Sequence, residues 1–350
     1  MTTPPVVFLN YAQVQTGAID NRELARPYQL ACAFLHCSII DRTGQLEPCF
    51  AQRVLDPIPE LRCSALTFAD ICQQRADQIV EIADRQDCDV CVLWSGGIDS
   101  TAALIAIGES ARKRNLQDRV VVILSMDSVQ EHPRFFLQQI ANRYRIRYVS
   151  YPLPSSLDAD AVNVTGEHGD QLFGSHLLTS YVRRGLGDVP YADILPLVIF
   201  ERLGLKRGAQ GIKRYLAPVV AASPVPIRSL FDYFWWLNFA LKWQEVSLRL
   251  PAWSGERARV IDSSLHHFYR TPDFQNWAMQ EARSPRPAVW AEYKREVKRY
   301  ILNATGDHRY YATKEKEDSL RNVLRPTDDS RRNCVVMYDD FQPHYRELEA

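Results

Sequence analysis

The sequence has no long hydrophobic run and no excess of either charge. No stretch approaches the ~20 consecutive apolar residues that span a bilayer, although 46% of the 350 residues are hydrophobic, enough for a sizeable core. The N-terminus lacks the basic start and apolar centre of a signal peptide. Lys plus Arg and Asp plus Glu number 42 each, so no net field attracts nucleic acid or anionic lipid. We therefore expect a soluble cytoplasmic enzyme without a membrane partner or strong nucleic-acid signal.

Cysteine pairs with metal-binding spacing are scarce as well. Of the eight cysteines, only Cys88 and Cys91 form a close C-x-x-C pair. A structural zinc site normally needs a second pair. Residues three apart on a strand face opposite sides of the sheet, so we expect both thiols to pack as small hydrophobes. A redox or iron–sulfur role is the alternative.

Residues 1–85 are expected to form a small α+β N-terminal lobe. Two strands are predicted within residues 30–57, in the strings LACAFLHCSII and LEPCFAQRVL. Thr67 can cap a helix over residues 68–84, with Asp70 completing a capping box.

From residue 86 the pattern changes to short apolar runs that alternate with helical segments. The predicted strands cover residues 89–95, 119–125, 145–152 and 160–166, and the predicted helices cover residues 100–114 and 131–143. This alternation predicts an α/β fold with a parallel sheet and helices on both faces. A helical, aromatic-rich extension after about residue 190 completes a domain over residues 86–320. Residues 321–350 are expected to form a charged C-terminal tail with one strand at 333–340.

The first predicted strand runs into its helix through a Ser-Gly-Gly loop. Gly96 and Gly97 let the backbone turn tightly and approach a phosphate without a Cβ in the way. The following helix N-terminus offers unpaired N–H groups to an anion. Asp99 would repel a bare phosphate, so its place in the first turn indicates either a cap or a bridging Mg²⁺. The hydroxyl groups that can add donors are those of Ser95, Ser100 and Thr101. A plain glycine turn is the structural alternative, and no Walker motif occurs.

The string SGGIDS (95–100) resembles the pyrophosphate loop of the N-type ATP pyrophosphatases, the PP-loop superfamily. Asparagine synthetases, GMP synthetases, NAD synthetases and tRNA-thiolating enzymes belong to it. The resemblance implies an adenine nucleotide alpha hydrolase-like sheet that binds ATP and Mg²⁺ and cleaves ATP between its α and β phosphates.

A second segment, TGEHGDQLFGS (165–175), is similar to the S-G-E-G-x-D-E-L-F-G-G segment of asparagine synthetases. Gly166 and Asp170 fit that pattern, whereas His168 replaces a glycine. Asp170 can share a Mg²⁺ with Asp99, because a hard divalent ion prefers carboxylate and phosphate oxygens. Glu167 is then free to take a proton from an attacking amine. A solvated acidic loop that caps a helix is the alternative.

The resemblance is looser elsewhere. It implies that Lys242, in the aromatic segment 230–250, faces the leaving pyrophosphate, with Arg249 as a possible second cation; a core helix is the alternative. It also implies that adenine or ribose lies against Ser125, Met126 and Asp127, at the end of the second strand. Residues 266–279 resemble the substrate-side segment of the same family, and the charged stretch that contains Lys314 and Lys316 is typical of solvated surface.

The sequence thus predicts an ATP-dependent amide-forming ligase, asparagine synthetase-like, that adenylates a carboxylate and releases AMP and pyrophosphate. Only about 85 residues precede the ATP domain and residue 2 is Thr, so we expect no glutaminase domain. Nitrogen would come from free ammonia, an amine or a separate glutaminase partner. The alternatives are a PP-loop enzyme that modifies a nucleobase, by sulfur insertion or nitrile formation, and an idle nucleotide-binding scaffold.

Overall fold

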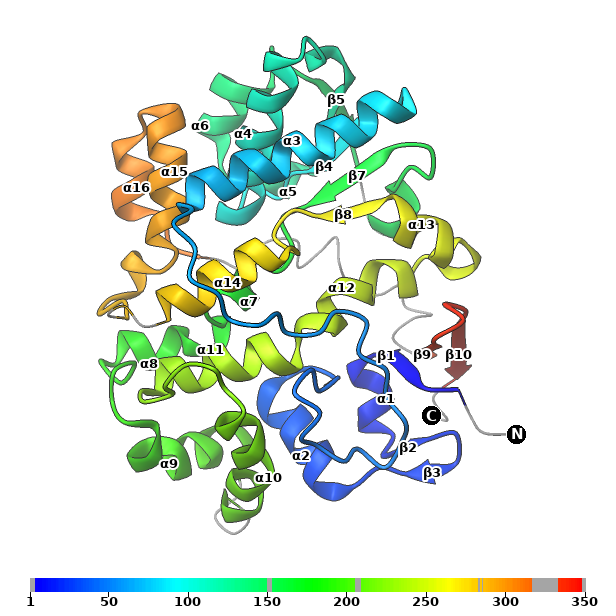
Figure 1. Ribbon diagram of the computed structural model, residues 1–350, viewed down its shortest axis with the longest axis vertical. Helices are drawn as coiled ribbons and strands as arrows, with labels where there is room; N and C mark the ends of the chain where they lie inside the picture. The colour runs from blue at the N-terminus through cyan, green and yellow to red at the C-terminus, as the bar shows by residue number, and fades with distance from the viewer. Residues whose placement is uncertain are drawn as a thin grey trace.

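The fold is α/β and centres on a five-stranded parallel sheet (Figure 1). The computed structural model describes residues 4–149, 153–204, 209–282, 284, 286–316 and 333–347. The strand order is β6-β5-β4-β7-β8. The strands are β4 (Val90–Leu93), β5 (Val120–Leu124), β6 (Arg145–Tyr148), β7 (Val162–Thr165) and β8 (Leu265–His267). The four predicted strands are confirmed, although residues 150–152 of the third lie outside the described residues. The fifth strand, β8, is not predicted from the sequence; it overlaps the start of residues 266–279, which resemble a substrate-side segment.

Helices cover both faces of the sheet, as predicted. Val90 and Val92 of β4 point into the main core with α3 (Phe68–Gln86) and α4 (Ile98–Lys113). Cys91 and Leu93, one position on, belong to a second cluster that includes side chains of α12 (Trp243–Ala252) and α13 (Ala258–Ser264). Burial on both faces explains why this strand is apolar throughout rather than alternating.

The helix predicted after Thr67 is confirmed as α3. The Thr67 side chain accepts from the backbone N–H of Asp70, and the Asp70 carboxylate accepts from the Thr67 N–H, as a capping box requires. Its apolar residues recur along one face and pack on α4 beside the sheet.

The two strands predicted within residues 30–57 are wrong. The first lies mostly in α2 (Arg26–Leu35), which has a proline in its first turn and buries Tyr28, Ala31 and Leu35. The second forms no named strand, and Gln52 makes only an isolated bridge to Val6. A short apolar run with no clear alternation fits a buried helix as well as a strand.

The two ends of the chain meet in one small antiparallel sheet. β1 (Val6–Leu9) pairs with β9 (Asn333–Tyr338), which pairs with β10 (Pro343–Glu347). The strand predicted at 333–340 is therefore confirmed, and it lies beside the N-terminal strand (Figure 1). Nearby are α1 (Tyr11–Gln15), β2 (Ala18–Ile19) and β3 (Arg22–Glu23).

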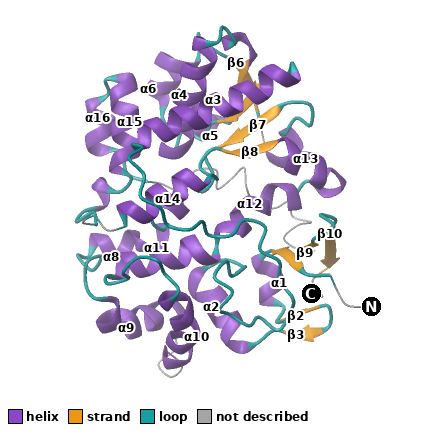
Figure 2. Cartoon of the chain, viewed as in Figure 1, coloured by secondary structure: helices purple, strands orange, loops and turns teal. Residues whose placement is uncertain are grey.

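The chain after β7 is mainly helical, as predicted (Figure 2). The longer of these helices are α9 (Tyr191–Leu203), α10 (Ala209–Ala221), α11 (Leu230–Leu241), α12, α14 (Pro272–Glu281) and α15 (Arg295–Thr305). Every residue of α11 is buried, which fits its aromatic sequence. Within the described ranges, no helix is long and apolar enough to cross a membrane.

Candidate functional site

The two motif segments meet at one edge of the sheet. The Ser-Gly-Gly loop follows β4, and the segment at 166–168 follows β7, which pairs in parallel with β4. The strand order reverses here, because β5 and β6 lie on one side of β4, while β7 and β8 lie on the other. Ligands of open parallel sheets bind beyond the carboxyl ends of the strands at such a switch point.

Three glycines allow close packing around this edge. Gly96 has φ +77°, and a Cβ there would lie 2.7 Å from the Cβ of Glu131. A Cβ on Gly166 would lie 2.6 Å from the backbone N of Ser100. One on Gly169 would collide with the carboxylate of Asp99. Gly166 and Gly169 are therefore required where the second motif packs against the first, and Gly96 is required where the loop packs against the helix that ends at Glu131.

The hydroxyl groups of the first motif organise the loop itself. Ser95 Oγ lies 2.9 Å from Ser100 Oγ and accepts from the Gly97 N–H at 3.2 Å. Thr101 Oγ1 accepts from Trp94 Nε1 at 3.0 Å, which fixes the indole against α4. Gly97 is the N-cap of α4 and supplies no side-chain acceptor to the first turn. The turn thus has the open N-terminus that an anion can use.

Asp99 and Asp170 converge on Lys294, a residue that the sequence did not indicate. The Lys294 ammonium donates to Asp99 Oδ2 and to Asp170 Oδ1, the latter at 2.6 Å, and its side chain is fully buried. Lys316 Nζ lies 3.0 Å from Asp170 Oδ2. The sequence predicts a solvated Lys316, but its ammonium group contacts the carboxylate of Asp170.

Burial and the two lysines act on these carboxylates in opposite directions. Burial raises the pKa of Asp99 despite Lys294. Burial by itself would also raise the pKa of Asp170, but Lys294 and Lys316 outweigh it and hold that pKa well below its usual range. Asp170 is therefore the more firmly ionised of the two.

The residues present fit a cation held by two carboxylates. Asp99 Oδ1 is buried without a hydrogen-bond partner. The part of the chain that the structure describes contains no group of three or more His, Cys, Asp or Glu side chains suited to a metal. Mg²⁺ commonly takes one or two carboxylates and completes its shell with water and substrate phosphates, so Asp99 and Asp170 can suffice.

Glu167 is held by Arg249 of α12. The Arg249 Nη2 contacts both carboxylate oxygens, with Oε1 at 2.5 Å, and the Glu167 and Arg249 side chains are 11% and 22% exposed. Glu167 lies at the same sheet edge as Asp170, two residues before the start of α7 (Gly169–Phe173). The carboxylate predicted to accept a proton is therefore oriented by a second side chain.

His168 occupies a left-handed backbone position, with φ 72°, where the resemblance implies glycine. Such a conformation costs a non-glycine residue roughly 1 kcal/mol. Its ring is buried against Trp243, and its Nε2 lies 2.9 Å from Ser247 Oγ. Burial lowers the pKa of His168. These contacts tie the loop to α12, which also carries Arg249.

Some of the other predicted site residues lie at this sheet edge, whereas Lys242 does not. Ser125 caps α5 (Met126–Glu131) at the end of β5, and Met126 is 59% exposed beside it, so both lie at the same sheet edge. The structure does not bring Lys242 to this edge. It lies at the junction of α11 and α12, where its charge acts on His36 and Cys37.

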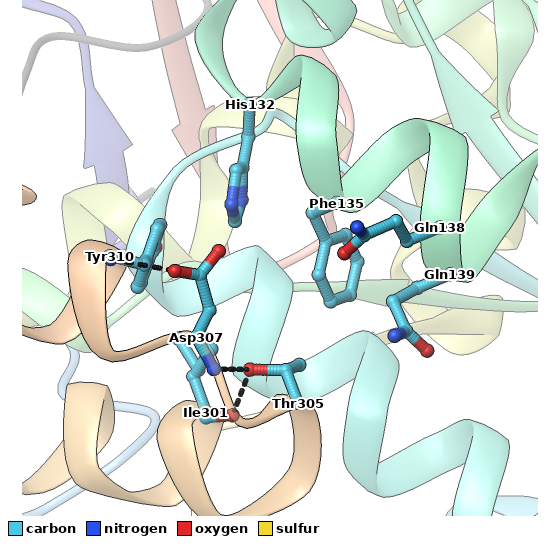
Figure 3. A pocket seen from close by; sticks show the side chains of 8 residues that line it. All are labelled: His132, Phe135, Gln138, Gln139, Ile301, Thr305, Asp307 and Tyr310. Carbon is cyan, nitrogen blue, oxygen red and sulfur yellow. Dashed lines mark hydrogen bonds between the residues drawn. The ribbon is translucent and has the colours of Figure 1, made fainter.

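A small pocket lies beside His132, just beyond the end of α5 (Figure 3). His132 stacks between Phe135 and Tyr310, with ring centroids 5.2 Å and 4.3 Å away, and its Nδ1 has no hydrogen-bond partner. The cavity measures about 10 Å³, close to the minimum for a single water molecule. It is too small for a nucleotide.

The C-x-x-C cysteines remain apart from this site. Cys91 is buried in β4 on the face that packs on α12 and α13, and burial raises the pKa of its thiol to about 11. Cys88 precedes the strand and is partly exposed. A thiol with a raised pKa is a poor metal ligand and nucleophile.

No protein-family model matches this chain, and a search of curated proteins finds no match.

Proposed function

We propose that this protein is an ATP-dependent amide-forming ligase of the asparagine synthetase-like type, acting in the cytoplasm, where ATP is available. The proposal rests on one observation. The Ser-Gly-Gly loop, the Asp99–Asp170 pair with its two lysines, and Glu167 all lie at the switch point of one parallel sheet.

The phosphates of ATP would lie against residues 95–97 and the N-terminus of α4. There the glycines leave room, and the first-turn N–H groups favour negative charge. Asp99 and Asp170 would hold Mg²⁺, which supplies charge neutralisation to the phosphates when bound. Ser125 and Met126 flank the same edge, on the side where adenine or ribose would lie.

In the first step a substrate carboxylate oxygen attacks the α-phosphorus of ATP. The bond from that phosphorus to the bridging oxygen breaks, giving an acyl-adenylate and pyrophosphate. Lys294 and Lys316 both contact Asp170. Because Asp170 would lie beside the phosphates, the two ammonium groups would offset negative charge on the leaving pyrophosphate. They take the role that the resemblance implied for Lys242.

In the second step an amine nitrogen attacks the acyl carbon. The amine loses its proton to Glu167, the bond to AMP breaks, and the amide forms. Arg249 donates to both oxygens of the Glu167 carboxylate and thereby orients it.

ATP–pyrophosphate exchange with a panel of carboxylic acids, aspartate included, tests the proposal directly. Exchange that depends on one acid, and that Asp170→Asn abolishes without unfolding the protein, is expected. Glu167→Gln should retain exchange and slow amide formation. Absence of exchange with every acid, despite measurable ATP binding, would shift the assignment to nucleobase chemistry or to an idle scaffold.

The source of nitrogen has a separate test. We expect the pure protein to release no glutamate from glutamine and to use ammonia, an amine or a glutaminase partner. Glutamate release by the isolated chain would contradict this part of the proposal.

A further inference from the structure

Lys294 is held in place from several sides. Its backbone lies in the left-handed region, with φ 58°, at the N-cap of α15. The preceding Tyr293 stacks on Trp290, with ring centroids 4.3 Å apart and nearly parallel planes. The Tyr293 hydroxyl also reaches Asp170 Oδ1 at 3.4 Å. A non-glycine residue persists in such a conformation when its surroundings over-determine it.

The charges at this point already balance. Two carboxylates, Asp99 and Asp170, contact two ammonium groups, those of Lys294 and Lys316. The Lys294 nitrogen lies within hydrogen-bonding distance of both carboxylates, in the space where one ion could bridge them. A divalent ion bound there would face a buried ammonium, and like charges in a poorly solvated site repel strongly.

We propose that Lys294 is the resident cation of the Asp99–Asp170 pair, and that it excludes divalent metal ions until a polyphosphate draws its ammonium away. Phosphate oxygens are strong acceptors for an ammonium group. Once Lys294 donates to them, Asp99 and the Oδ1 atom of Asp170 would be available to hold the metal, while Lys316 still contacts Asp170 Oδ2. Metal and polyphosphate then bind with positive coupling. This polyphosphate step rests on the proposed function; the exclusion of metal by Lys294 does not.

Mn²⁺ binding to the nucleotide-free protein, followed by electron paramagnetic resonance, tests the exclusion. Lys294→Met removes the resident charge and keeps the length of the side chain. We expect Mn²⁺ to bind Lys294→Met at least about tenfold more tightly than the wild type, within the usual range of site-to-site coupling. Lys242→Met is the matched control, since it loses the same charge at a position where that charge acts on His36 and Cys37, and it should bind Mn²⁺ as the wild type does.

Thermal unfolding gives a second readout with Mg²⁺. Lys294→Met leaves two carboxylates close together, so its Tm should fall below that of the wild type. Mg²⁺ alone should raise the Tm of Lys294→Met and leave that of the wild type unchanged, because a ligand stabilises only a state that it binds. Equal Mn²⁺ affinity and equal Mg²⁺ response in the two proteins would overturn the proposal.

A third experiment uses only the wild-type protein, so it does not depend on the folding of a variant. Inorganic pyrophosphate should make Mn²⁺ binding at least about tenfold tighter, and Mn²⁺ should tighten pyrophosphate binding by the same factor. Tight Mn²⁺ binding to the wild type without pyrophosphate would refute exclusion by Lys294. No binding of pyrophosphate under any condition would instead count against the proposed function, while the Lys294→Met comparison would still decide the role of the lysine.

Discussion

Gly169 of α7 lies directly against the carboxylate of Asp99 in α4. A Cβ at position 169 would lie 2.5 Å from Asp99 Oδ1 and 2.6 Å from Oδ2. The first turns of two helices, after two neighbouring strands, therefore meet without a side chain between them. This contact is why the carboxylates of Asp99 and Asp170 can share one lysine.

Gly169→Ala should disturb the site at its centre. The new methyl group must displace the Asp99 carboxylate or the start of α7, at a cost of about 1–3 kcal/mol. We expect a lower urea midpoint and loss of ATP binding by calorimetry. Gly211→Ala is the control, because nothing lies within 4 Å of a Cβ there; in helix α10 it should be neutral or slightly stabilising. Undiminished ATP binding by Gly169→Ala would show that the contact is not needed.

Glu167 and Arg249 should be strongly coupled. Arg249→Met leaves a largely buried carboxylate without its partner, which typically costs about 3–5 kcal/mol. Glu167→Gln leaves the guanidinium with a neutral acceptor and should cost less. A double-mutant cycle by urea unfolding should give a coupling energy of about 1–3 kcal/mol. Additive effects of the two substitutions would mean that the pair contributes nothing to the folded state.

His132 should make the protein less stable as the pH falls from about 6.5 to 4. Burial lowers the pKa of His132 to about 4, so over this window the unfolded chain binds a proton that the folded protein does not. Stability therefore rises with pH across the window, by up to about 3 kcal/mol for this residue. His132→Phe, which can keep the stacking on Phe135 and Tyr310, should make the pH dependence of stability less steep. The rest comes from other histidines whose pKa burial lowers, among them His168, His266 and His267. Urea unfolding at several pH values measures it, with exposed His308→Phe as the control; an unchanged slope in His132→Phe would contradict the prediction.

Arg42 should anchor the segment between α2 and α3. It is buried, and burial lowers its pKa to about 9. Its guanidinium donates to the carbonyls of Asp56 and Phe239 and to the side chain of Gln275.

Arg42→Met should leave these acceptors unpaired and cost about 2–4 kcal/mol. Arg42→Lys should restore little, because one ammonium cannot reproduce a planar fork. Urea midpoints measure both, with Arg26→Lys, at an exposed position of α2, as the control. Full recovery by lysine would show that charge rather than geometry matters at this position.

Local sequence was a good guide where one element carries its own signal. The capping box at Thr67 and the apolar runs of β4, β5 and β7 predicted their elements to within a few residues. The same reasoning failed at α2, because a short apolar run does not distinguish a buried helix from a strand. It also missed β8, a three-residue strand that contains two histidines and is recognisable only by its pairing with β7.

Local sequence could not identify which lysines lie at the site. The resemblance implies a pyrophosphate-facing role for Lys242, yet its charge acts on His36 and Cys37. Lys294 and Lys316 stand in charged stretches that resemble ordinary solvated surface. The residues around Lys294 do not distinguish it from a solvated surface lysine, because its carboxylate partner Asp99 is 195 positions away in the chain.

The alternation of strands and helices, the turn at Gly96 and Gly97, and the two acidic motifs can all be read from the sequence, because each depends on neighbouring residues. Tertiary structure alone decided that the motifs meet, that Lys294 lies between Asp99 and Asp170, and that Arg249 holds Glu167. The physical reason is that parallel strand pairing places the ends of β4 and β7 together. Burial at that edge then requires a partner for every charge, and distant helices supply it.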